Sequence, residues 1–242
     1  MLNSAFIDLI KQSKYLVILT GAGISTESGL ADFRGPNGVW TRRDKGLKPL
    51  PGPAIQSVFP NKGHIAIKKL FDLGILKFLI SQNVDNLHLK SGVSNAFLAE
   101  LHGNYHLYKC VDCDKRFSAE EIGWNKDLHG PGYRKDAPKP NQPTCPDCQG
   151  RIISSIVNFG DPMPEEELRN AHFHAKQADV FLIVGSSLVV QPAASLPMEC
   201  LNNGGSVVII NKGTTSLDNL ASFKIEENAG FVLEQLIKQL EE

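Results

Sequence analysis

Short apolar runs with the composition of buried strands recur along the chain. They are rich in β-branched and aromatic residues and lie at residues 15–19, 76–81, 179–185 and 206–211. Between and around these runs, apolar residues recur at helical spacing in residues 64–73, 165–178 and 229–240. Strands that alternate with helices in this way predict an α/β fold with a Rossmann-like parallel sheet.

Two stretches interrupt this alternation. Residues 35–62 are rich in Pro and Gly and predict a loop with at most short helices. Residues 105–151 contain two cysteine pairs and five of the fourteen prolines. We expect both stretches to be insertions that form a smaller lobe above the sheet edge. The expected organisation is a Rossmann-like domain of residues 1–34, 63–104 and 152–242, an insertion at 35–62 and a module at 105–151.

The size and charge of the chain limit its class. A length of 242 residues suffices for one domain, or for one large and one small domain. The net charge is −1 and like charges form no block, so we expect no direct nucleic-acid partner. No apolar stretch reaches the roughly 18–20 residues of a membrane span, and the amphipathic residues 1–15 predict a first helix, not a secretory signal. We therefore expect no membrane association.

The first predicted strand runs directly into a Gly-Ala-Gly turn at residues 21–23. Residues 24–30 are expected to begin a helix, so the turn would present backbone N–H groups and a helix N-terminus to a pyrophosphate. Thr26 stands where the usual fingerprint has a third glycine, and a plain strand–turn–helix unit is the alternative. An Asp-Phe-Arg triplet at residues 32–34 follows closely and favours a bound nucleotide.

Four of the five cysteines form two Cys-x2-Cys pairs, Cys110 with Cys113 and Cys145 with Cys148. Two such pairs supply four thiolates to one tetrahedral zinc and leave no open position, so the predicted zinc is structural. An iron–sulfur cluster and four unconnected buried cysteines are the less favoured alternatives. Cys200 is expected to be a small core residue. Paired cysteines without a disulfide framework predict an intracellular, reducing compartment, with the cytoplasm as the expected location.

The second predicted strand ends in a polar cluster that includes Gln82, Asn83 and Asp85. Open α/β sheets bind ligands at the carboxyl ends of their strands, and buried amides and acids cost stability unless something binds them. A polar turn with a helix cap from Asp85 or Asn86 is the alternative. The cluster therefore predicts a ligand site.

His102 lies between this polar cluster and the cysteine-containing module. A histidine titrates near neutral pH, so it can serve as a general base. The other histidines have no comparable setting, although His64 and His88 could be packing or supporting groups. We therefore expect His102 to be the catalytic histidine.

A set of motifs follows in a characteristic order: GAGIS at residues 21–25, ADFRG at 31–35, QNVD at 82–85, HGN at 102–104, the cysteine pairs, VNFGD at 157–161, GSSLVVQPA at 185–193 and the strand end at Asn211. This set spans essentially the whole chain and resembles the sirtuins, which are NAD-dependent protein-lysine deacylases. Residues 35–47 and 82–92 are similar to the branch that contains the animal nuclear sirtuins. Residues 158–164 are similar to the commoner deacetylase pattern.

The resemblance implies roles for individual residues. The NAD contacts would be Gly21, Ala22, Gly23, Ser25, Asp32, Phe33, Arg34, Gln82, Asn83, Asp85, Gly185, Ser186, Ser187, Asn211, Lys212 and Ala229. His102 would be the base, with Asn83 as a second catalytic residue. The acyl-lysine channel and its flanking strands would contain Val157, Phe159, Gly160, Val189 and Val190. An acyl-lysine peptide would bind as an added strand between the two lobes.

The resemblance also implies the products, which are the free lysine, nicotinamide and an O-acyl-ADP-ribose. Alternatives are a protein mono-ADP-ribosyltransferase on the same scaffold, a non-catalytic NAD-sensing adaptor and a hydride-transferring dehydrogenase. Intact Asn83, Asp85 and His102 favour deacylation over the first two. The dehydrogenase is disfavoured because no acid follows about 20 residues after the glycines at a strand end.

The acyl preference follows from one missing motif. Sirtuins that prefer succinyl-lysine or malonyl-lysine carry a Tyr-x-x-Arg pair beyond the Asp-Phe-Arg loop, whereas residues 41–52 contain no tyrosine. Arg42 and Arg43 could substitute only if the loop turned inward. We expect acetyl or longer apolar acyl groups to be the substrates.

Overall fold

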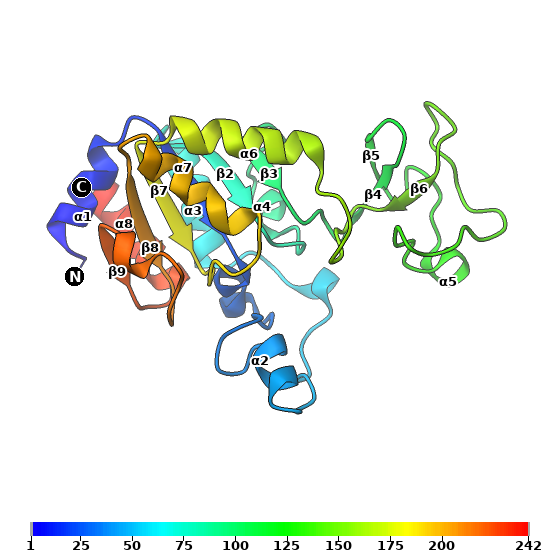
Figure 1. Cartoon of the computed structure of the whole chain (residues 1–242), viewed down its shortest axis with the longest axis horizontal. Helices are drawn as coiled ribbons and strands as arrows, with labels where there is room; N and C mark the ends of the chain where they lie inside the picture. The colour runs from blue at the N-terminus through cyan, green and yellow to red at the C-terminus, as the bar shows by residue number, and fades with distance from the viewer. Residues whose placement is uncertain (1, 242) are drawn as a thin grey trace.

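In the computed structural model, which describes residues 2–241, six parallel strands form the main sheet. Their order is β3-β2-β1-β7-β8-β9 (Figure 1). Their bounds are β1 Leu16–Thr20, β2 Leu76–Ser81, β3 Leu98–Glu100, β7 Val180–Val184, β8 Ser206–Ile210 and β9 Phe223–Ile225. The predicted parallel sheet is confirmed. The strand order reverses at the β1–β7 pair, where open α/β sheets bind their ligands.

Helices cover both faces of this sheet. One face carries α1 Ser4–Gln12, α3 Lys62–Asp72 and α8 Ala229–Glu241, and the other carries α6 Glu165–Gln177 and α7 Leu196–Asn202. Side chains of β1 alternate between the two cores, with Ile18 in the first and Leu19 in the second. The helices expected at residues 64–73, 165–178 and 229–240 correspond to α3, α6 and α8. None of the helices within residues 2–241 combines the length and apolar character needed to cross a membrane.

A separate antiparallel sheet forms the small lobe, which lies on the right in Figure 1. Its order is β5-β4-β6, with β4 Leu107–Cys110, β5 Arg116–Ser118 and β6 Ile152–Ser154, and a short helix α5 Lys126–His129 lies beside it. Ile152 is buried in the small core with Tyr108 and Trp124. The small sheet therefore continues past residue 151, the predicted end of the module.

Residues 35–62 extend from the main domain at the bottom of Figure 1 and contain α2 Val39–Asp44 and a 3-10 turn Ile55–Ser57. They lie apart from the small lobe, so the expectation that both insertions form one lobe is wrong. Short turns and helices elsewhere are α4 Leu87–Lys90 and the 3-10 segments Asn95–Phe97, Ala193–Ser195 and Asp218–Leu220.

The helix expected after the glycine turn is instead a 3-10 segment, Ala22–Ser28. The Ile24 amide donates to Gly21 O, three residues back, and the Thr26 hydroxyl donates to Gly23 O. Gly29, at φ 91°, ends the segment in the left-handed conformation. The tighter winding follows from these local bonds.

Candidate functional site

The loops after β1 and β7 meet backbone to backbone. The Gly21 amide donates to Val184 O at 3.0 Å, and the Gly23 amide donates to Gly185 O at 2.8 Å. A Cβ atom on Gly23 would lie 2.7 Å from the Cα atom of Gly185, which itself has φ +63°. The glycines are therefore needed for the contact between these loops. The Gly23 amide is occupied by Gly185 O, so it is not the donor that would meet a phosphate.

The predicted polar residues gather at this junction. The Ser25 hydroxyl donates to Asp85 Oδ2 at 2.6 Å, and Asn83 Nδ2 donates to Gly21 O at 3.2 Å and lies 3.3 Å from Ser25 Oγ. Ser25, Asn83 and Asp85 are all buried. Asp85 Oδ1 also accepts from the Leu87 amide, so it serves the start of α4 as well as the cluster. The capping role of the alternative interpretation is therefore present, and a contact of Asp85 with a ligand stays a prediction.

Gln82 connects the cluster to the opposite loop and to His102. Its Nε2 donates to Ser186 Oγ at 2.8 Å, and its main-chain O lies 2.8 Å from His102 Nδ1. Because a carbonyl oxygen can only accept, the proton is on Nδ1 and the lone pair is on Nε2. Burial lowers the pKa of His102, and the bond to Gln82 opposes that shift. The imidazole is therefore neutral at neutral pH, with a basic Nε2.

His64 and His88 are buried behind the glycine loop. His64 Nε2 lies 3.5 Å from Ser25 Oγ, and His88 Nε2 lies 2.9 Å from Thr20 Oγ1. Burial lowers the pKa of His64 to about 4, against an opposing effect of Asp85, and lowers the pKa of His88 well below its usual value. Both rings are neutral and support the loops from behind.

An aromatic series connects the Asp-Phe-Arg triplet to the predicted substrate segment. The Phe33 ring lies 4.8 Å from Trp40, and Trp40 lies 5.7 Å from Phe159. Arg34 stacks over Trp40 at 5.0 Å and pairs with Asp44 at 2.7 Å. Trp40 was absent from the predicted site; its only signal was an aromatic residue within a Pro- and Gly-rich stretch.

The substrate segment is also joined to the histidine. The Val157 amide donates to His102 O at 3.0 Å, which brings residues 157–160 beside the predicted base. Gly160 has φ +85° and is exposed, so a turn follows Phe159 directly. On the opposite loop, Ser187, Val189 and Val190 continue from Gly185, and Val189 is exposed.

The four paired cysteines of the small lobe form one cluster. Their Sγ atoms all lie within 4.8 Å of one another, with 3.5 Å between Cys110 and Cys148 and 3.7 Å between Cys113 and Cys145. A tetrahedral zinc with Zn–S bonds of about 2.3 Å separates its sulfur atoms by about 3.8 Å. The thiolate set therefore fits a structural zinc and offers no open position for a substrate.

Comparison with known proteins identifies the family. The Sir2 family model matches residues 52–192. The chain is 36% identical over 236 residues to the NAD-dependent protein deacetylase of Thermotoga maritima, with 90% of each chain covered. The chain belongs to the Sir2 family. It is 39% identical over 223 residues to the NAD-dependent protein deacetylase SRT1 of Arabidopsis thaliana, of which this sirtuin spans only 44%.

A solved structure extends this likeness to three dimensions. The structure described as a Sir2–p53 peptide–NAD+ complex matches with a TM-score of 0.77 and 32% identity, over 100% of this sirtuin and 99% of the other chain. The sirtuin resemblance of the sequence is thereby confirmed. The individual NAD, channel and catalytic contacts stay predictions.

The predicted adenosine end lies where β8 finishes and α8 begins. Asn211 Nδ2 donates to the carbonyl oxygens of Lys212 and Gly213, which shapes the loop after β8. Ala229 is the first residue of α8, and the next amide, that of Gly230, donates to Glu27 Oε2 at 2.8 Å. Glu27 was not predicted; it joins the glycine turn to this helix.

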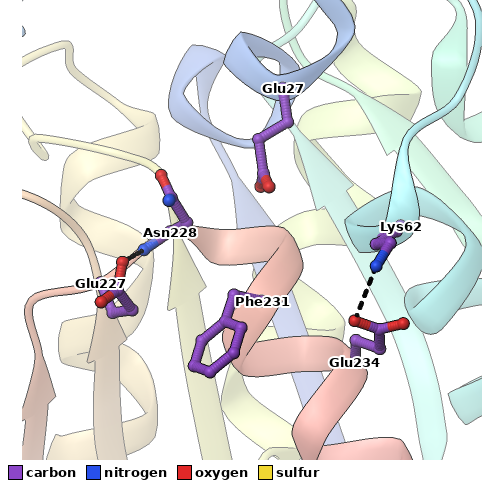
Figure 2. Close-up of a pocket in the computed structure, with 6 residues that line it drawn as sticks. All are labelled: Glu27, Lys62, Glu227, Asn228, Phe231 and Glu234. Atoms are coloured by element: carbon purple, nitrogen blue, oxygen red, sulfur yellow. Dashed lines mark hydrogen bonds and ion pairs between the residues drawn. The ribbon is translucent and has the colours of Figure 1, made fainter.

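An open cavity of about 370 Å³ lies beside Glu27 (Figure 2). It is lined by Glu27, Lys62, Glu227, Asn228, Phe231 and Glu234. Lys62 is already paired with Glu234 at 3.1 Å. Glu227 lies 3.8 Å from Lys212, so Glu27 is the carboxylate of the lining that keeps a negative charge in the cavity, which disfavours a phosphate anion there.

Replacement of Cys145 by alanine is expected to remove the zinc and destabilise this sirtuin. Zinc should fall well below about one ion per chain, and a loss of about 4 kcal/mol would lower the melting temperature by about 8–16 °C. Metal analysis after dialysis and thermal unfolding measure the two effects. Cys200→Ala is the matched control, because Cys200 is a buried thiol in the core of the main domain, between the parallel sheet and α6 and α7. Full stability without zinc would contradict the prediction.

Proposed function

We propose that this sirtuin removes acyl groups from lysine side chains of proteins in an NAD-dependent reaction, with His102 as general base. With one water consumed, the products would be free lysine, nicotinamide and O-acyl-ADP-ribose. The observation that carries the proposal is the bond from His102 Nδ1 to Gln82 O, which leaves Nε2 as the only basic nitrogen of a half-buried neutral ring. The relatives named above are NAD-dependent protein deacetylases, which supports the same activity.

The residues at the β1–β7 junction suit a dinucleotide. Close backbone contact of Gly21, Gly23 and Gly185 leaves little side-chain bulk between the loops. Buried Asn83 and Asp85 supply an amide and a carboxylate, groups that match the carboxamide and hydroxyls of a nicotinamide riboside. When bound, NAD supplies the ribose carbon to which the acyl oxygen is transferred as nicotinamide leaves.

Residues of this chain would position the reacting groups and shield them from solvent. Ser25 fixes the Asp85 carboxylate, and Gln82 connects Ser186 to the backbone beside His102. His102 Nε2 would accept the proton of a ribose hydroxyl and so make that oxygen nucleophilic toward the acyl carbon. The aromatic rings of Trp40 and Phe159 would exclude water from the same region.

An acyl-lysine peptide would bind as a strand between residues 157–160 and residues 188–190. Main-chain hydrogen bonds supply most of the affinity in this mode, so the peptide sequence would be read only weakly. The closeness of Val157 to His102 supports the placement, because it brings one flanking segment to the base. The p53 peptide named for the structural relative is consistent with a peptide substrate.

A product assay by mass spectrometry tests the proposed function. Incubation with NAD and an acetylated peptide should give O-acetyl-ADP-ribose, nicotinamide and a peptide lighter by one acetyl group. Protein or peptide heavier by ADP-ribose would instead support the mono-ADP-ribosyltransferase alternative. No turnover with NAD still bound would support the non-catalytic adaptor. The cytoplasmic location and the lack of membrane or nucleic-acid partners stay predictions.

We expect kcat/KM to fall on the acid side of its pH profile, with an apparent pKa below 6.5. The neutral form of His102 is the active one, and its fraction falls as pH falls through the pKa. Because burial lowers that pKa from 6.5, activity should persist to a lower pH than an exposed histidine would allow. Initial rates across pH with subsaturating peptide measure this fall. An apparent pKa above 6.5 would contradict the assignment.

A further inference from the structure

One guanidinium in the small lobe lies against two carboxylates of the main domain. Arg116, on β5, places its NH2 atom 2.6 Å from Glu167 Oε1 on α6, and its NH1 atom 3.5 Å from Glu100 Oε2 on β3. The side chains of Arg116, Glu100 and Glu167 are 19%, 4% and 13% exposed. This contact joins the two lobes through largely desolvated charges.

Glu100 begins the turn that carries His102. The Glu100 amide donates to Glu167 Oε2 at 2.9 Å, and its Oε1 accepts from Asn104 Nδ2 at 2.7 Å. The Gly103 amide donates to Glu100 O at 3.0 Å. The Glu100 side chain therefore holds the far end of the turn, at Asn104, and Glu167 holds its first residue.

The opposite side of the turn is held by the chain that follows β6. Asn104 and Ser155 exchange hydrogen bonds, from the Asn104 amide to Ser155 Oγ and from that hydroxyl to Asn104 O. A Cβ atom on Gly103, which has φ +78°, would lie 2.0 Å from Ser155 O. The His102 turn thus has little freedom as long as Glu100 stays in place.

The position of Glu100 depends on the positive charge of Arg116, because Glu100 and Glu167 are two neighbouring carboxylates. Burial raises the pKa of Glu100 to about 7, and Asn104 and Arg116 oppose the rise. Burial also raises the pKa of Glu167, again with Arg116 as the opposing charge. Without the guanidinium, two neighbouring buried carboxylates would have to separate or take up a proton.

We propose that Arg116 is a positioning residue that orients His102, through its clamp on Glu100 and Glu167. The small lobe then contributes to the reaction through this contact, in addition to any stability from zinc. The inference rests on the proposed function, because it takes His102 as the base.

Arg116→Met should lower kcat by about 10- to 10²-fold, since a displacement of about 1 Å at a reacting group costs that much. KM for NAD and peptide should change little, because the loss lies in the chemical step. Arg116→Lys should recover part of kcat. Arg169→Met, which removes an exposed arginine of α6, is the matched control and should keep wild-type kcat.

The imidazole NMR spectrum of His102 provides a second measurement that needs no turnover. With ¹⁵N-labelled histidine, the wild-type protein should show a single tautomer protonated on Nδ1, and Arg116→Met should show averaging of the two ring nitrogens. Zinc content should stay near wild type in Arg116→Met, whereas the melting temperature should fall because two buried carboxylates lose their counter-charge, so rates and spectra are measured well below it. Unchanged kcat or an unchanged His102 signal would overturn the proposal, as would a kcat loss matched by loss of zinc.

Glu167→Gln with Glu166→Gln as control replaces the arginine variant if Arg116→Met fails to fold, since Glu166 is an exposed neighbour on α6. Glu167→Gln should shift the His102 signal and lower kcat, and Glu166→Gln should do neither. Equal behaviour of the two variants would overturn the proposal. Wild-type protein without deacylase activity would count against the proposed function, and the NMR comparison would still decide the clamp.

Discussion

Replacement of His102 by alanine is expected to lower kcat for deacylation by about 10²- to 10⁴-fold, the usual contribution of a general base. Folding should be nearly unaffected, because the variant loses one hydrogen bond to Gln82 O, worth about 1 kcal/mol. NAD affinity should also be retained, since Asn83, Asp85 and Ser25 hold one another independently of the imidazole. Single-turnover rates and calorimetric titration with NAD measure the two quantities.

His102→Asn sharpens this test. Asparagine offers an N–H donor for Gln82 O but has no basic nitrogen, so it should be as inactive as alanine. His106→Ala is the control, because His106 is a half-buried histidine four positions further along the same segment. More than about a tenth of wild-type kcat in either His102 variant would remove this residue from the role of base.

The sequence pattern predicts the main sheet where strands are long and buried. β1 and β7 read as continuous apolar runs because both faces of the sheet are covered by helices. β3 and β9 contain three residues each, too few for a periodic pattern, and were not predicted. Residues 152–154 were assigned to the Rossmann-like domain and not predicted as a strand, since the pairing of β6 with β4 is a tertiary contact.

Local sequence likewise predicts some candidate site residues and not others. Gln82, Asn83 and His102 could be proposed because polar residues at strand ends form local clusters in the sequence. Contacts such as Gln82 with Ser186 and Trp40 with Phe159 join segments more than a hundred residues apart, so no local sequence pattern predicts them. The glycines were predicted from their spacing, but part of their role, the contact with Gly185, emerges only from the fold.

Butyryl-lysine and succinyl-lysine peptides should differ by at least about 10² in kcat/KM, in favour of the butyryl group. The two acyl groups have similar lengths and differ chiefly in the terminal carboxylate. In the predicted channel, Phe159 and the adjoining rings of Trp40 and Phe33 would offer that end aromatic surface. Burial of an unpaired carboxylate costs several kcal/mol, and about 2.7 kcal/mol already supplies a factor of 10².

The arginines of the loop are engaged elsewhere. Arg34 pairs with Asp44 at 2.7 Å, Arg42 Nε donates to Lys48 O at 2.8 Å, and Arg43 is an exposed residue 3.7 Å from Asp44. A succinyl group would have to break one of these contacts to gain an arginine of this loop as its partner. Initial rates on matched peptides test the expectation, with acetyl-lysine as the reference. Equal kcat/KM values would mean that a cation reaches the acyl group, and loss of succinyl activity alone in Arg42→Met or Arg43→Met would identify it.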